Sequence, residues 1–173
     1  MIALFAAASI ALDAAIPAMR SALGSSASWR MERELAGSSR PLVSTGVVEC
    51  VAGEGIKWTV LDPFPSSVSM TPESMVFSDE DGERVKPLKD MPHYAEIKKR
   101  TDAFAAGDSS AFDGLFKIEA TLADDGEGWT LRITPEVRAM RRLFREVELS
   151  GAATLTNAVM RTGDGGVSRI SFR

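Results

Sequence analysis

Short apolar segments separated by turn-forming residues are the feature that most constrains the fold of this chain. Near the start of the pattern, apolar Trp29 and Met31 alternate with charged Arg30 and Glu32. A two-residue period of this kind is typical of a β-strand with one face in an apolar interior and the other in water. The alternation returns at Ile56, Trp58 and Val60.

Clusters of glycine with aspartate, glutamate or serine separate these segments. Such residues accept the backbone conformations of tight turns, so each cluster favours a hairpin between consecutive strands. The expected turns lie at residues 37–39, 53–55, 79–82, 124–128 and 163–166. Together with two helical segments, these hairpins predict an α+β fold that is mainly antiparallel β.

The helical segments lie at the start and in the middle of the chain. Residues 13–24 are expected to form a helix that Asp13 can cap. Residues 92–107 contain good helix formers and are expected to form a second helix. Its apolar side carries Tyr94, Ile97 and Phe104. Residues 135–144 begin with a proline at a favoured first-turn position, and either a helix or an extended loop fits them.

The first twelve residues form an apolar run that is too short to span a bilayer. The run is similar to part of a signal peptide but lacks the positively charged region that precedes one. We expect residues 1–12 to be a signal-peptide remnant, and the alternative is a backward extension of the first helix. No linker, repeat or low-complexity tract divides residues 13–173, which are therefore expected to form a single domain.

Composition and motifs argue against several functional classes. The net charge is −4, and the cationic residues do not gather into a stripe, so we expect no nucleic-acid partner. His93 and Cys50 are the only histidine and cysteine, which leaves no ligand set for zinc and no nucleophilic triad. No phosphate-binding or dinucleotide-binding glycine motif occurs. The sequence therefore predicts a protein that is not an enzyme and that holds no metal or cofactor.

Several short segments follow one another in a characteristic order. Residues 29–33 read WRMER and residues 40–46 read RPLVSTG, and IKW at 56–58 and DPF at 62–64 follow them. This order of aromatic, strand-opening glycine, tryptophan and proline resembles that of the LolA family of periplasmic lipoprotein carriers. The resemblance continues to one branch of the family at residues 104–108, 129–135, 143–151 and 168–172.

This resemblance implies a half-open, unclosed β-barrel with an N-terminal helix and a helical lid over a hydrophobic cavity. It implies a monomeric carrier in the periplasm that takes an acylated lipoprotein or lipid from an inner-membrane exporter to an outer-membrane acceptor. The residues expected to line the cavity and its lid are Trp29, Met31, Trp58, Val60, Val68, Met70, Tyr94, Ile97 and Phe104. Long and aromatic side chains suit acyl chains of variable shape.

Two alternatives remain at this stage. The same fold can serve as a protein-interaction module that senses a lipid or a peptide. Each expected cavity residue can also simply pack the core. The chain departs from the carriers at Met31, where glutamine is frequent in the family, and at Ala52 and Gly53, where carriers place an arginine before a proline.

Overall fold

The computed structural model describes residues 26–38, 40–51, 55–71, 73–90, 114, 116–124, 127–142 and 144–173. In this part of the chain, eleven strands form one antiparallel sheet in the order β6-β5-β4-β3-β2-β1-β11-β10-β9-β8-β7. The strands are β1 (Ala27–Glu34), β2 (Leu42–Val51), β3 (Gly55–Asp62), β4 (Ser66–Met70), β5 (Ser74–Asp79), β6 (Gly82–Pro87), β7 (Phe116–Leu122), β8 (Trp129–Pro135), β9 (Phe144–Gly151), β10 (Leu155–Thr162) and β11 (Val167–Phe172). A short 3-10 helix, η1 (Leu88–Asp90), follows β6, and a one-turn helix, α3 (Arg138–Arg141), lies between β8 and β9.

The order of the strands shows two meanders joined at one seam. Strands β1 to β6 pair consecutively, as do β7 to β11, and the last strand β11 then pairs with the first strand β1. At the seam, Trp29 lies opposite Phe172, and Ser28 and Arg173 exchange two backbone hydrogen bonds of 3.0 and 2.9 Å. The seam brings the two ends of the described chain side by side in the middle of the sheet.

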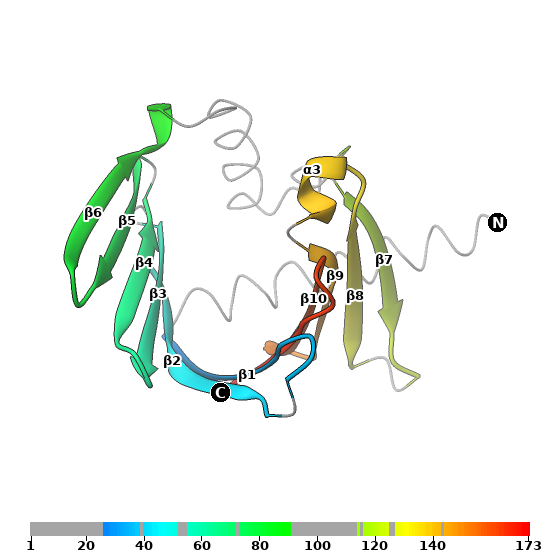
Figure 1. The fold of residues 1–173 in the computed structure, drawn as a ribbon. Helices are drawn as coiled ribbons and strands as arrows, with labels where there is room; N and C mark the ends of the chain where they lie inside the picture. Colours follow the sequence, from blue (N-terminus) through cyan, green and yellow to red (C-terminus); the bar gives the residue numbers. More distant parts are fainter. Residues whose placement is uncertain are drawn as a thin grey trace.

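The sheet curves strongly but does not close. Figure 1 shows β1 at the base of a U, with β5 and β6 on one limb and β7 and β8 on the other. The edge strands β6 and β7 do not pair with each other. The expectation of a mainly antiparallel fold is therefore confirmed, and the unclosed sheet is consistent with a half-open barrel.

The expected helices have different outcomes. Residues 135–144, for which a helix and a loop both fitted, contain the short helix α3. The predicted N-terminal helix at 13–24 and the predicted lid helix at 92–107 lie outside the described residues, as does the signal-peptide remnant at 1–12. The lid, the cavity beneath it and the single-domain boundary at residue 13 therefore stay predictions.

The β5–β6 hairpin illustrates how the sequence sets the turns. Asp79 pairs with Gly82 across a two-residue loop, and Gly82 has a φ of 111°, a conformation that favours glycine. The carboxylate of Asp79 also accepts a hydrogen bond of 3.1 Å from the backbone N–H of Asp81. The acidic cluster at 79–82 is thus a turn, as the sequence predicts.

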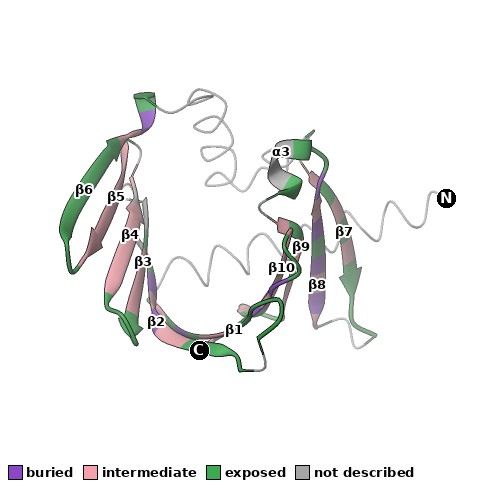
Figure 2. Ribbon diagram, viewed as in Figure 1, coloured by how far each residue is buried: buried purple, intermediate pink, exposed green. Residues whose placement is uncertain are grey.

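Burial is uneven across the sheet. Figure 2 shows buried residues in β8 and near the base of the U, whereas β6 is largely exposed. The small core at β8 consists of Trp129 and Leu131, and half-buried apolar residues of β7, β9 and β10 pack against it. The buried apolar residues of the described chain are Trp29, Val48, Leu88, Trp129, Leu131, Ile133 and Ala158.

Candidate functional site

The register of the strands gathers apolar side chains on one face of the sheet. Residues directly opposite each other in a ladder point to the same face, so Trp58 shares a face with its partners Val48 and Val68. Val68 in turn lies opposite Phe77 of β5. We call this surface the apolar face, and on strands β1 to β5 and β11 its described members include Trp29, Met31, Val48, Trp58, Val60, Val68, Phe77, Ile170 and Phe172.

An aromatic cluster lies at the base of this face. The rings of Trp29 and Trp58 stack with their centroids 4.7 Å apart and an interplanar angle of 24°. Phe172 meets Trp58 edge-on, with centroids 6.3 Å apart and an angle of 85°. Offset stacking and edge-to-face contact are the two favoured arrangements of aromatic pairs. The cluster therefore joins the N-terminal strand, the third strand and the C-terminal strand.

Gly46 allows this cluster to form. Trp29 belongs to β1 and Trp58 to β3, so their rings must meet across β2, where Gly46 lies opposite Trp29. A Cβ atom on Gly46 would lie 2.5 Å from Cζ2 and 2.7 Å from Cε2 of Trp29, and it would also collide with the backbone oxygen of Thr59. Only glycine fits at this position.

The apolar face is not sealed around the cluster. Trp29 is buried, with 3% of its surface exposed, but Met31, Trp58, Val60 and Val68 are only half-buried. A compact core would bury such side chains almost completely. Part of the apolar surface on this side of the sheet is therefore still accessible.

The other limb continues the apolar face in a better-packed form. Leu131 of β8 lies opposite Leu149 of β9 and Ala120 of β7. Trp129 is 3% exposed, and its Nε1 donates a hydrogen bond of 2.7 Å to the backbone oxygen of Ala152. This limb therefore has a satisfied, tightly packed core, in contrast to the half-buried residues of β3 and β4.

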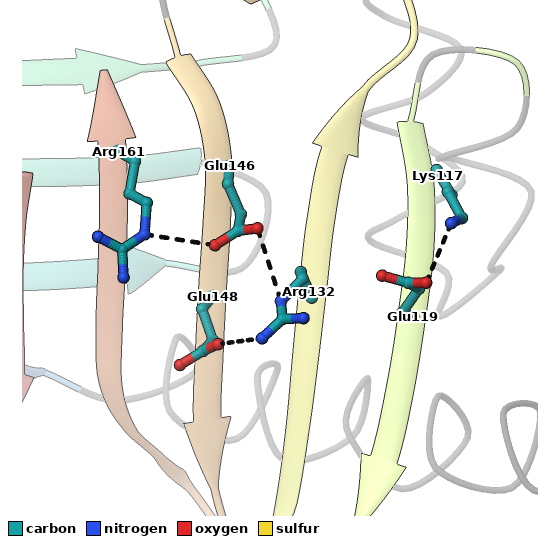
Figure 3. A network of polar contacts seen from close by, with 6 residues as sticks. All are labelled: Lys117, Glu119, Arg132, Glu146, Glu148 and Arg161. Carbon is teal, nitrogen blue, oxygen red and sulfur yellow. Dashed lines mark hydrogen bonds and ion pairs between the residues drawn. The ribbon is translucent and has the colours of Figure 1, made fainter. Parts of the chain in front are cut away.

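The opposite face of the sheet is charged. Arg132 lies between Glu146, at 3.6 Å, and Glu148, at 3.2 Å, and Arg161 pairs with Glu146 at 3.5 Å. Figure 3 shows these side chains on one side of β8, β9 and β10, with strands of the other limb behind the sheet. Hence the network lies on the convex side, and the apolar residues that alternate with it face the inside of the U.

The carboxylates of this network affect the pKa of Arg132. The hydrogen bond from Arg132 to Glu148, together with the charges of Glu146 and Glu148, raises the pKa of the Arg132 guanidinium. On β7, the hydrogen bond and charge of Lys117 lower the pKa of Glu119. Both groups are exposed, so these pairs give the convex face a solvated, stably ionised surface rather than a tuned catalytic site.

The structure places five of the nine predicted site residues together. Trp29, Met31, Trp58, Val60 and Val68 share the apolar face. The backbone of Met70 pairs with Ile56 and Met75, and its side chain lies outside the described set. Tyr94, Ile97 and Phe104 lie in the segment that is not described. That any of the nine contacts a ligand stays a prediction.

Sequence reasoning left four of the named members of the apolar face out of the predicted site. They are Val48, Phe77, Ile170 and Phe172, which share the face with the predicted residues. For Ile170 and Phe172 the signal was present, because alternation runs through the last strand. The alternation alone does not place Ile170 and Phe172 beside Trp29 and Met31. That placement depends on the pairing of β11 with β1, whose residues are more than 130 positions apart in the sequence.

Two kinds of feature are absent from the described residues. No group of three or more His, Cys, Asp or Glu side chains among them could hold a metal ion. None of the helices in these ranges is long and apolar enough to cross a membrane.

Comparison with known proteins gives likenesses in structure alone. No protein-family model and no curated protein matches the chain. Among solved structures, a chain of the Pseudomonas aeruginosa MucA/MucB complex matches 95% of this chain with a TM-score of 0.51 and 15% identity. This chain spans only 55% of that one.

Two further structures match over most of both chains. The LolA superfamily protein NE2245 from Nitrosomonas europaea aligns over 98% of this chain and 91% of its own, with 11% identity and a TM-score of 0.47. LprF from Mycobacterium bovis aligns over 96% and 91%, with 13% identity and a TM-score of 0.40. At these identities a likeness concerns the fold and not the activity. Of these comparisons, the one with the MucA/MucB chain has a TM-score above 0.5, and it shows a likeness in overall fold alone.

Proposed function

We propose that this protein is a periplasmic carrier that holds the acyl chains of a lipoprotein or another lipid against its apolar face. In this role it would receive the cargo from an exporter in the inner membrane and deliver it to an acceptor in the outer membrane. The observation that carries the proposal is the continuous apolar face of an unclosed sheet, whose central residues Trp58, Val60 and Val68 are only half-buried.

The energetics of acyl chains favour such a surface. Each methylene group exposed to water costs about 0.8 kcal/mol, so a lipidated molecule needs cover before it can cross an aqueous compartment. An open sheet can present a broad apolar surface without breaking its own hydrogen-bond ladder. The charged convex face, with Arg132 and its carboxylate partners, keeps the outside of the molecule compatible with water.

The first experiment is native mass spectrometry with lipid extraction on the protein produced in its own compartment. Co-purified acylated species would support the carrier role and identify the cargo class. A mass that corresponds to the protein alone, together with no binding of a fluorescent long-chain acyl probe, would contradict it.

A matched pair of variants on β4 tests whether the apolar face is the binding surface. Val68 points to the apolar face, and its neighbour Ser67 points to the opposite face, while both are half-buried. Val68→Asp should weaken binding of the acyl probe at least about tenfold, because a carboxylate in an apolar contact must lose its hydration. Ser67→Asp should bind the probe like the wild type. Circular dichroism would verify that both variants are folded, and equal binding by the two would place the site elsewhere.

A second function is proposed because of one specific structural likeness. One matched chain, with a TM-score of 0.51, comes from a complex of two proteins, MucA and MucB. By analogy, the concave side of this chain could recognise a peptide or lipoprotein signal as an interaction module. An empty apolar face in mass spectrometry, combined with recovery of one defined protein partner, would favour this function over lipid transport.

A further inference from the structure

The indole nitrogen of Trp29 has an unusual environment. Nε1 of Trp29 is buried, and no acceptor in the described part of the chain takes its hydrogen bond. Buried polar groups are paired in the large majority of cases, and buried tryptophan N–H groups usually find an acceptor. This N–H group can therefore take an acceptor that the described part of the chain does not supply.

Trp129 provides an internal comparison. It lies on the same face of the sheet and is also 3% exposed, but its Nε1 donates to the backbone oxygen of Ala152 at 2.7 Å. The fold can therefore satisfy a buried indole on this face. The difference between the two residues lies in their local surroundings.

The neighbours of Trp29 leave its indole N–H without a hydrogen bond. One face of its ring stacks on Trp58, and the residue opposite it on β2 is Gly46, which has no side chain. The point where a Cβ of Gly46 would lie is 2.7 Å from Cε2, the ring carbon bonded to Nε1, and 1.9 Å from the backbone oxygen of Thr59. That oxygen lies near this part of the ring but does not accept a hydrogen bond from Nε1.

We infer that Nε1 of Trp29 donates a hydrogen bond to the carbonyl oxygen of an ester or amide group at the root of a bound acyl chain. This inference rests on the proposed carrier function and adds a chemical preference to it. A neutral carbonyl fits better than a phosphate or carboxylate, because a charged group would lose its hydration among Trp58, Phe172 and the neighbouring apolar residues. The protein would then distinguish acyl chains from simple alkyl chains of equal length.

The test compares two lipids on three proteins. The lipids are a diacylglycerol and a dialkylglycerol ether with identical chain lengths, which differ only in the presence of the carbonyl groups. The proteins are the full-length wild type, Trp29→Phe and Trp129→Phe. The wild type should bind the diacyl lipid about fivefold more tightly than the diether, the range of one neutral hydrogen bond. Trp29→Phe should lose this preference while retaining affinity for the diether, and Trp129→Phe should keep the preference.

A second measurement requires no substitution. The chain contains three tryptophans, so a 15N-labelled sample gives three indole N–H resonances. The resonance of Trp29 should shift downfield when the diacyl lipid binds, as expected for a newly formed hydrogen bond, and should not do so with the diether. A shift of this resonance in the wild type would indicate a hydrogen bond directly. The loss of preference in Trp29→Phe could then not be attributed to a general loss of packing.

The outcomes separate the inference from the function on which it rests. Equal affinity of the wild type for the two lipids, with an unshifted Trp29 resonance, would overturn the inference and leave the carrier function standing. Absence of binding to either lipid would overturn both. A preference for the diacyl lipid that persists in Trp29→Phe would show that another donor recognises the carbonyl.

Discussion

At the scale of single residues, Gly46 decides whether the aromatic cluster can form. Its missing side chain allows the Trp29 ring to cross β2 and stack on Trp58. Sequence alternation was sufficient to assign Trp29 and Trp58 to one face. It could not show that their rings touch, because the contact depends on a glycine in the strand between them.

The Gly46→Ala substitution should destabilise the protein. Its Cβ would collide with the backbone oxygen of Thr59 and with the Trp29 ring, and a backbone atom in a ladder cannot easily move away. Overpacking of this kind typically costs about 1–3 kcal/mol of unfolding free energy. Urea denaturation followed by tryptophan fluorescence measures the loss. Thr45→Ala, next to it on the opposite face of β2, is the control and should have the smaller effect. A stable Gly46→Ala variant would show that the cluster can rearrange.

At the scale of elements, the hairpins were the most predictable part of the fold. The clusters at 79–82 and 163–166 form turns, because their glycines and aspartates supply the conformations and hydrogen bonds that turns need. The pairing of β1 with β11 was not predictable from local pattern. It depends on the energy of the whole sheet, in which the last strand of the second meander pairs with the first strand of the first meander. The helices expected at 13–24 and 92–107 stay predictions.

The β10–β11 turn should contribute a pH-dependent part of the stability. The Asp164 carboxylate accepts hydrogen bonds from the hydroxyl of Thr162 and, at 3.1 Å, from the backbone N–H of Gly166. These bonds lower the pKa of Asp164 below its usual value of 3.8, the Thr162 bond having the larger effect. A group with a lowered pKa in the folded state stabilises the protein above its unfolded pKa, and this contribution is lost as the pH falls through the folded pKa.

The comparison of wild type with Asp164→Asn measures this contribution. Above about pH 5 the wild type should melt about 2 °C higher, because only the charged carboxylate forms the stronger hydrogen bonds. The difference should shrink as the pH falls below 3.8. Thermal denaturation at several pH values tests this. A Tm difference between the two proteins that does not change with pH would show that the charge of Asp164 does not stabilise the turn.

At the scale of the whole molecule, the sheet has an apolar and a charged surface, because successive side chains of each strand point to opposite faces. The same alternation that places Leu131 and Leu149 on one side places Arg132 and Glu148 on the other. The sequence predicted this alternation for the first and third strands, where Trp29, Met31, Trp58 and Val60 lie on one face. It could not show which parts of the apolar face are tightly packed, as around Trp129, and which stay half-buried, as around Trp58.

A half-buried apolar face predicts that cargo stabilises the protein as a whole. A ligand that binds only the folded state adds about 2.7 kcal/mol of stability at a free concentration about 100 times its Kd. For a domain of this size, that gain raises Tm by roughly 5–10 °C. A thermal-shift titration with a long-chain acyl lipid should therefore give a Tm that increases with the logarithm of lipid concentration. An acetylated analogue without long chains should leave Tm unchanged, and Val68→Asp should need about ten times more long-chain lipid for the same rise in Tm, because its carboxylate interrupts the apolar face. A Tm that does not depend on lipid concentration would mean that the exposed apolar surface of β3 and β4 serves a protein partner instead.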